Sequence, residues 1–479
     1  MNNVNDIFQG DFSDRDEKIK TLLHVDECFD ILRRRFVIGG RQAAFYSVDG
    51  FLRGEVAEKV MEFFYSLKEE DMPKDFGDFI QQAIPYIDII KVKDQESFVR
   101  YLLSGMSCLM VEGYTEVIAL DMREYPSRSV AEPDKDKVLR GSRDGFVESL
   151  LPNIALIRRR IRDTDLIFSL QNIGTSSQTD VAICYMKGRV KEDVLQKVKD
   201  RLSNIQVDSL TMNQESLAEC IFKKGWFNPF PKFKFTERPD STAACLLEGS
   251  IVILCDNSSA AMIIPASLFD IIEDANDYYF PPVTGTYLRL SRMVINIVAI
   301  FLTPLFILLM QNPDLVPPAL EFIKLKEASN IPPVLQLLIL EVAIDGLRMA
   351  SVNTPNMLTT PLSIIAGIVF GDYTVNSGWF NSEIMLYMAF VAVANYTQSN
   401  MELGYAIKFL RIQLLILTGF FNLWGFIIGT VIILIAPLTN RTIIGRNYLY
   451  PLIPFDGNQL LKRFFRFSRY RYDKLGGSR

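Results

Sequence analysis

Long runs without a charged side chain fill much of the second half of this 479-residue chain. Residues 293–310, 384–401 and 412–436 are three such runs, each of the length that a helix needs to cross a bilayer. Charged residues are dense before Arg292 and sparse from there to Arg441. The pattern predicts an α/β soluble region followed by an α-helical, multi-span membrane domain over residues 285–440. Residues 441–479 then form a basic tail.

A further apolar stretch, residues 335–355, carries charges. Glu341 and Asp345 are four residues apart and Arg348 follows three residues later, so a helix places all three on one face. Such a face cannot contact lipid without a cost of several kcal/mol. We expect an ion pathway or an intramembrane polar network here, in which Arg348 compensates the two acids. The alternative is that the charges pair among themselves or across subunits and only hold the helices together. The candidate residues are Glu341, Asp345, Arg348, Asn353 and Pro355.

The flanks of the apolar runs predict how the chain crosses the membrane. Arg289 and Arg292 precede the first run, which favours a cytoplasmic start. The tail interleaves Lys and Arg with Phe and Tyr, and we expect it to lie against anionic cytoplasmic lipid. The number of full crossings must then be even. Prolines interrupt residues 349–371, so we interpret residues 357–371 as a re-entrant element, with residues 412–436 as a full span.

The soluble region is predicted to contain two related α/β subdomains, residues 1–136 and 137–284. Residues 36–48 are typical of a β-hairpin with a Gly-Gly turn. The sequence LLSG at 102–105 and the sequence LLEG at 246–249 are each followed by a strand, a turn and a second strand. An internal duplication explains this order, with chance similarity as the alternative. The N-terminus lacks the features of a signal peptide, so we expect this region to be cytoplasmic.

An arginine cluster in the second subdomain is a candidate contact surface. Such a cluster can bind phosphate or lipid headgroups, but salt bridges to acids of a neighbouring domain are the commoner outcome. We therefore expect a domain or lipid contact here. The cluster consists of Arg158, Arg159, Arg160 and Arg162.

The residue inventory gives little reason to expect an enzyme. The six cysteines show no CxxC spacing, and the single histidine, His24, lies among residues typical of an amphipathic helix. No glycine-rich nucleotide motif and no combination of nucleophile, base and metal ligands is present in the sequence. We expect no catalytic residue, no metal and no cofactor. The net charge of −5 gives no reason to expect nucleic acid as a partner.

Several segments resemble the GerA family of spore-germination proteins, in its A-subunit type. Residues 347–355, LRMASVNTP, and 450–455, YPLIPF, are most similar to a branch of the family distinct from the nutrient-receptor A subunits. That branch usually has histidine before Thr-Pro, where this chain has Asn353. The resemblance extends over nearly the whole chain. Its other segments are NIALIRRRIRDTD at 153–165, TDVAICY at 179–185, ERPD at 237–240, LEG at 247–249 and DYY at 277–279.

The resemblance implies a multi-pass protein of the spore inner membrane whose soluble region faces the spore core. It also implies a homo-oligomeric ring, expected to be a pentamer, in which the spans enclose an ion-conducting pore. Members of the similar branch are thought to work with a small membrane partner and to amplify ion release without binding nutrients. Two hypotheses follow: an oligomeric channel or channel component releasing monovalent cations during germination, or a non-conducting membrane scaffold that organises other germination proteins.

Overall fold

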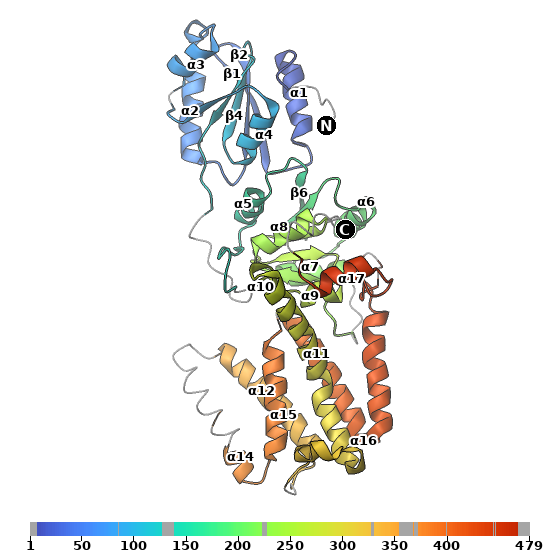
Figure 1. Cartoon of the computed structure of the whole chain (residues 1–479). Coiled ribbons are helices and arrows are strands. Elements are labelled where there is room, and N and C mark those ends of the chain that lie inside the picture. Colours follow the sequence, from blue (N-terminus) through green and yellow to red (C-terminus); the bar gives the residue numbers. More distant parts are fainter. Residues whose placement is uncertain are drawn as a thin grey trace. The chain divides into compact units, whose positions relative to one another are not determined.

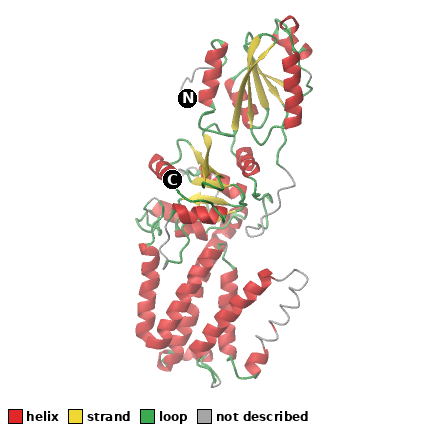
Figure 2. Ribbon diagram, turned by 180° about the vertical axis from the view of Figure 1, so that it is seen from behind, coloured by secondary structure: helices red, strands yellow, loops and turns green. Residues whose placement is uncertain are grey.

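The computed structural model of the chain describes residues 7–84, 86–126, 138–222, 228–326, 330–353, 367, 372–398, 400–443, 445 and 447–467 (Figure 1). The chain divides into two compact units. Unit 1 comprises residues 1–223, 233–265 and 469–479, and unit 2 comprises residues 224–232 and 266–468. The described strands of the two sheets all belong to unit 1, whereas the described part of unit 2 is built from helices (Figure 2). This separation matches the expected order of an α/β region followed by a helical one.

The first subdomain of unit 1 is a five-stranded antiparallel sheet with the strand order β1-β2-β4-β5-β3. Gly39 and Gly40 form the turn between β1 and β2, with φ angles of 50° and 74°. Positive φ at both turn residues suits a two-residue hairpin and favours glycine. The predicted hairpin is therefore confirmed. The elements are α1 (Phe12–Leu22), β1 (Ile31–Ile38), β2 (Arg41–Val48), α2 (Gly54–Ser66), η1 (Glu69–Asp71), α3 (Phe76–Gln82), β3 (Ile89–Val92), α4 (Gln95–Leu103), β4 (Ser107–Val111) and β5 (Val117–Leu120).

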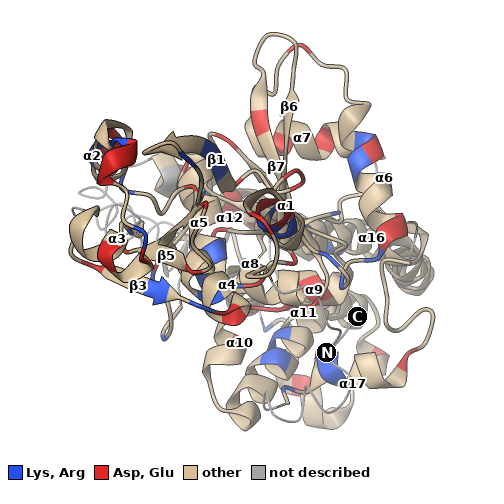
Figure 3. Ribbon diagram, turned by 90° about the horizontal axis from the view of Figure 1, so that it is seen from above, with Lys and Arg blue, Asp and Glu red and all other residues tan. Residues whose placement is uncertain are grey.

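Helices cover both faces of this sheet. Helices α2 and α3 lie on one side of it, and α1 and α4 lie on the other (Figures 1 and 2). Phe64 of α2 and Phe79 of α3 are fully buried in a core that also contains Ile118 and Leu120 of β5. Charged residues lie along the outer helices, as the colouring of α2 and α3 shows (Figure 3). Each helix buries its apolar face and leaves its charged face in water, and this determines how it packs on the sheet.

A buried acid fastens α1 to the sheet. Asp16 accepts a hydrogen bond from Arg33 Nε at 3.0 Å, and it also contacts Arg35 and the Tyr46 hydroxyl. Burial alone raises the pKa of this carboxyl, but the hydrogen bonds from Arg33, Tyr46 and Arg35 outweigh burial, and the pKa is lowered from its ordinary value. Asp16 is therefore a stable anion inside the first subdomain.

The second subdomain repeats the first element by element. Its strand order is β6-β7-β9-β10-β8, the order of the first sheet. In both subdomains a helix ends before a glycine with positive φ, Gly105 or Gly249, and two paired strands follow. The predicted repeat of helix, glycine, strand, turn and strand is confirmed. The elements are α5 (Leu150–Arg160), β6 (Leu166–Ile173), β7 (Thr179–Met186), α6 (Glu192–Ser203), α7 (Asn213–Ile221), β8 (Lys234–Thr236), α8 (Pro239–Leu247), β9 (Ile251–Cys255) and β10 (Ala261–Ile264).

Two helices of unit 2 are long and apolar enough to cross a membrane, counting the described residues only. They are α11 and α16; α15 is apolar but shorter. The number of membrane spans stays a prediction. The elements of unit 2 are α9 (Leu268–Ile272), α10 (Asn276–Tyr279), α11 (Pro282–Gln311), η2 (Pro313–Leu315), η3 (Pro318–Ile323), α12 (Pro333–Asn353), α14 (Asp372–Asn376), α15 (Ser382–Tyr396), α16 (Met401–Thr439) and α17 (Gly457–Phe464).

Helix α16 folds back on itself at Asn422, where φ is 53° and ψ is −132°. A Cβ placed on Gly425 would meet the Leu417 carbonyl, and one placed on Gly429 would come within 2.5 Å of Leu414. Residue 425 thus faces residue 417, and residue 429 faces residue 414. The two arms of α16 on either side of Asn422 therefore run antiparallel. The prediction of one continuous span over residues 412–436 is therefore wrong.

This reversal changes the topology argument made from sequence. A helical hairpin returns the chain to the side from which α16 starts, so an even number of crossings no longer requires a re-entrant element. The segment assigned that role, residues 357–371, lies outside the described residues except for position 367. Residues 127–137, at the predicted boundary between the two subdomains, likewise lie outside them.

Candidate functional site

Two helices bring four charged side chains together inside the apolar part of unit 2. Helix α12 carries Glu341 and Asp345, and the first arm of α16 carries Lys408 and Arg411, each pair spaced to share one helix face. Glu341 Oε1 lies 2.7 Å from both Nε and Nη2 of Arg411, and its Oε2 lies 3.4 Å from Lys408 Nζ. Lys408 also forms an ion pair with Asp345. We refer to these four residues as the charge network.

Backbone acceptors complete the charge network and draw in a third helix. Arg411 Nη1 donates to the Ala299 carbonyl of α11 at 3.2 Å. Lys408 Nζ donates to the Glu341 carbonyl at 3.2 Å. Helices α11, α12 and α16 are thus joined at one level by hydrogen bonds to charged groups, which are stronger than hydrogen bonds between neutral groups.

Three of the four members are buried. Glu341, Lys408 and Arg411 are 3%, 4% and 0% exposed, whereas the Asp345 side chain is 30% exposed. Taking ions out of water is costly, and pairing offsets that cost only when the geometry is good. Two acids face two bases, so the formal charges cancel. The charge network is therefore compensated, with one carboxylate open at its edge.

Arg348 does not take the role expected of it. Its guanidinium lies 5.1 Å from the ring centre of Tyr396 in α15 and 5.4 Å from that of Tyr405 in α16. The cations beside Glu341 and Asp345 are Lys408 and Arg411 instead. The expectation that Arg348 compensates the acids is wrong. Its guanidinium lies beside two aromatic rings instead, and such rings attract cations.

The two remaining predicted site residues are Asn353 and Pro355. Asn353 is exposed at the end of α12. Pro355 lies outside the described residues. A separate polar contact near the start of α12 joins it to α15, since the Gln336 amide donates to Asn381 Oδ1 at 2.9 Å and accepts from the Asn381 backbone at 2.9 Å.

Sequence reasoning missed Lys408 and Arg411. Both lie directly before the uncharged run at residues 412–436. The signal that could have found them is the one that singles out the acids: charges three or four residues apart within otherwise apolar sequence. Their pairing with α12 could not be read from sequence, because 67 positions separate Lys408 from Glu341.

One member of the arginine cluster, Arg158, joins the two subdomains of unit 1. Arg158 is 1% exposed, and its Nε donates to Asp30 Oδ2 at 2.8 Å. Its Nη2 also lies 3.3 Å from Cys28 Sγ. Burial raises the pKa of the Cys28 thiol to about 12, so the thiol stays protonated and donates to Asp30 at 2.9 Å. This arrangement favours the domain-contact interpretation for Arg158.

The other members of the cluster differ from Arg158. Arg159 lies over the Tyr125 ring, 4.5 Å from its centre. Arg160 pairs with Asp144 and donates to the Leu156 carbonyl at 2.8 Å. Arg162 is exposed. A lipid or phosphate contact in this cluster stays a prediction, and Arg162 is the member whose guanidinium is most open to one.

Two cations in the described part of the tail are buried against the protein. Lys462 and Arg463 of α17 are 8% and 9% exposed, and Arg463 Nη1 donates to Glu273 Oε2 at 2.8 Å. Arg289 of α11 donates to the Lys462 carbonyl at 2.9 Å. Phe465 is 45% exposed. Arg463 is bound by acids that precede α11, and contact of the tail with anionic lipid stays a prediction. The tail beyond residue 467 lies outside the described residues.

Helix α17 also fixes where the tail begins. The contact between Arg289 and Lys462 places α17 beside the start of α11, within unit 2. Arg292, the second cation of that helix start, pairs with both oxygens of Asp277 at 3.0 and 3.1 Å. The start of α11 and the tail therefore lie at one end of unit 2, as an even number of crossings requires.

Comparison with known proteins covers nearly the whole chain. The profile of the family described as Bacillus/Clostridium GerA spore germination protein matches residues 17–474. Stage V sporulation protein AF of Bacillus subtilis (strain 168) is 33% identical over 456 residues, which cover 95% of this chain and 92% of that protein. Spore germination protein A1 of the same organism is 28% identical over 377 residues, 78% of each chain.

One solved structure is also similar. It is the crystal structure of the N-terminal domain of the A subunit of the Bacillus megaterium spore germinant receptor GerK3. The identity is 25%, the TM-score is 0.40, and the match covers 53% of this chain and 93% of that one. The profile match and the 33% identity agree with the resemblance found in the sequence. The chain belongs to the GerA family of spore germination proteins.

Proposed function

We propose that the protein is a membrane component of the germination apparatus that assembles into a homo-oligomeric ring and passes monovalent cations. The proposal places it in the spore inner membrane with unit 1 on the core side, expects a pentamer, and includes contacts with a small membrane partner and other germination proteins. The family and the two apolar helices support membrane residence.

The observation that carries the proposal is the partly open carboxylate of Asp345. It lies on a helix among apolar helices, with its side chain 30% exposed although its partner Lys408 is buried. A carboxylate in that position cannot face lipid without a large cost, so it faces water or another protein chain. In a ring, symmetry repeats the same carboxylate once per subunit, and a ring of carboxylates attracts cations into a pore.

A scaffold without conduction is the second candidate, and a different observation favours it. Glu341 is nearly fully buried and contacts both Lys408 and Arg411, so this part of the charge network suits a structural tie better than an ion path. Under this proposal the charge network fixes α11, α12 and α16, while unit 1 gathers other proteins.

Ion flux separates the two candidates. The purified full chain is placed in liposomes loaded with potassium, and efflux is measured for the wild type, Asp345→Asn and the exposed-loop control Asp314→Asn. We expect efflux from the wild type and the control, and at least a fivefold reduction with Asp345→Asn. Crosslinking establishes that all three form the same oligomer. Absence of efflux from a folded, oligomeric wild type, alone and with candidate partners, contradicts conduction and favours the scaffold.

A further inference from the structure

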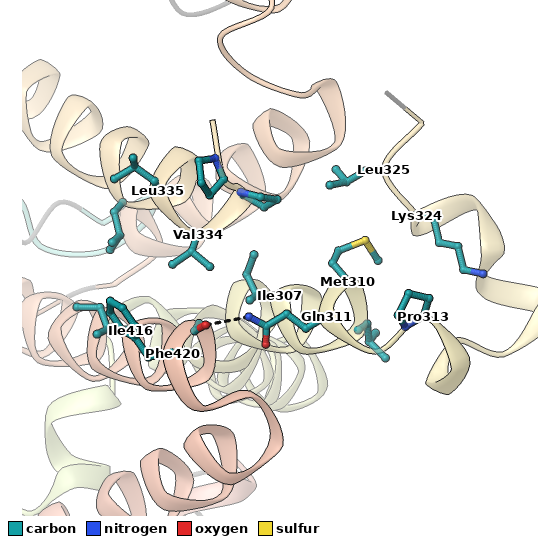
Figure 4. A pocket seen from close by; sticks show the side chains of 15 residues that line it. Ile307, Met310, Gln311, Pro313, Lys324, Leu325, Val334, Leu335, Ile416 and Phe420 are labelled. Atoms are coloured by element: carbon teal, nitrogen blue, oxygen red, sulfur yellow. Dashed lines mark hydrogen bonds between the residues drawn. The ribbon is translucent and has the colours of Figure 1, made fainter. Parts of the chain in front are cut away.

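A cavity of about 760 Å³ lies between three helices of unit 2 (Figure 4). Its walls come from the end of α11, the start of α12, the end of the first arm of α16, and the segment after η3. This volume lies in the range of small-molecule sites. The cavity lies about one and a half to two and a half turns along α16 from Arg411, on the side of the Asn422 reversal. It therefore lies at the end of unit 2 opposite α17.

The walls are suited to hydrocarbon. Leu338, Val334, Ile307 and Phe420 are among the apolar side chains that line the cavity (Figure 4). The polar side chain of Gln311 is engaged, because its Nε2 donates to the Gly419 carbonyl at 2.9 Å. A water molecule needs several polar partners to be held in a cavity, and walls of this kind supply few. The occupant therefore has an apolar body.

One cation marks the polar end of the occupant. Lys324 is the charged residue among the described residues that line the cavity. Its Nζ lies 3.4 Å from Glu321 Oε1, and the Glu321 side chain is 69% exposed. Exposed pairs of this kind contribute about 0–1 kcal/mol, so an anion can replace Glu321 at Lys324 at little cost. The charge at Lys324 selects an anionic head.

We infer that this cavity binds the acyl chain of one anionic phospholipid, with the lipid phosphate at Lys324. The helix ends that form the cavity are where a membrane-spanning bundle meets the headgroup layer, so a lipid there has its head at Lys324 and its tail between α11, α12 and α16. The inference rests on the membrane residence in the proposed function and does not require conduction.

Native mass spectrometry of the full chain in detergent tests the assignment. Phosphatidylglycerol is added to delipidated protein, and the fraction that keeps one lipid is compared with that for phosphatidylcholine and uncharged diacylglycerol. We expect one phosphatidylglycerol per chain, retained at least fivefold better than diacylglycerol. Lys324→Glu is expected to lower retention at least fivefold, whereas the matched control Lys326→Glu, outside the cavity lining, leaves it unchanged.

A second variant tests the acyl-chain end of the site. Leu338→Trp fills the cavity and is expected to abolish retention of phosphatidylglycerol, with the melting temperature showing that the chain is folded. Equal retention by the wild type and Lys324→Glu overturns the assignment of the head, as does equal binding of an uncharged lipid or of detergent alone. Unchanged retention in Leu338→Trp overturns the assignment of the cavity. Lipid retention without ion efflux refutes conduction and leaves this inference standing.

Discussion

At the scale of single residues, unit 2 balances its buried charges pair by pair. Arg411 is fully buried and depends on Glu341 and the Ala299 carbonyl for compensation. Lys408 is shared between Glu341 and Asp345. Removing one member of such a set leaves another charge buried without a partner, which costs more than the pair itself contributes.

Arg411→Met is therefore expected to destabilise the protein by about 3–5 kcal/mol, because Glu341 is then left with Lys408 alone. The double variant Glu341→Met, Arg411→Met keeps the pair of Lys408 and Asp345, so we expect it to be more stable than the single variant. Denaturant unfolding in detergent measures both. A double variant less stable than Arg411→Met would contradict the pairing, and Lys326→Met serves as the exposed control.

Asp16 predicts a pH dependence for the first subdomain. Its pKa in the folded protein is lowered, since hydrogen bonds from Arg33, Tyr46 and Arg35 outweigh the effect of burial. The folded state therefore prefers the anion, and the stabilisation is present above the ordinary pKa of 3.8 and is lost as the pH falls through the folded value. The stability difference between the wild type and Asp16→Asn, measured by unfolding, should be largest near neutral pH and shrink below pH 3.8. A difference that is constant with pH would show that Asp16 does not act through its charge.

At the scale of elements, local patterns predict unit 1 better than unit 2. The Gly39-Gly40 turn and the repeated glycines at 105 and 249 are signals contained in a few adjacent residues, and both are confirmed. The hairpin in α16 depends on Asn422, one residue among aromatic and aliphatic neighbours, so apolar composition alone predicts a continuous span. The partners of Glu341 were missed for a related reason, since they come from a distant helix.

Two substitutions at Asn422 test the reversal in α16. Asn422 has φ of 53°, which glycine adopts without strain and a β-branched residue does not. Both Asn422→Gly and Asn422→Val lose the hydrogen bond to Asn312 Oδ1 at 3.1 Å, so they differ mainly in backbone strain. We expect Asn422→Val to be less stable than Asn422→Gly by about 1–3 kcal/mol in thermal unfolding. Equal stability would indicate a continuous helix through residue 422.

At the scale of the whole molecule, α17 places the last described residues of the tail beside the start of α11. A protease added to one side of sealed vesicles should digest a C-terminal tag and unit 1 together, because the tail begins at the end of unit 2 where α11 starts. Immunoblotting with antibodies to the tag and to unit 1 measures the two losses. A tag that is protected while unit 1 is digested would contradict the hairpin in α16.

The cancellation of charge between α12 and α16 has an electrical consequence. A membrane potential does work only on net charge that moves through the field, about 2.3 kcal/mol per elementary charge per 100 mV. Glu341, Asp345, Lys408 and Arg411 moving as one body carry no net charge across it. Asp345 moving without Lys408 carries one. Currents that rise steeply with voltage would therefore mean that the ion pair of Asp345 and Lys408 separates when the protein opens. Currents that depend little on voltage would mean that this ion pair stays intact.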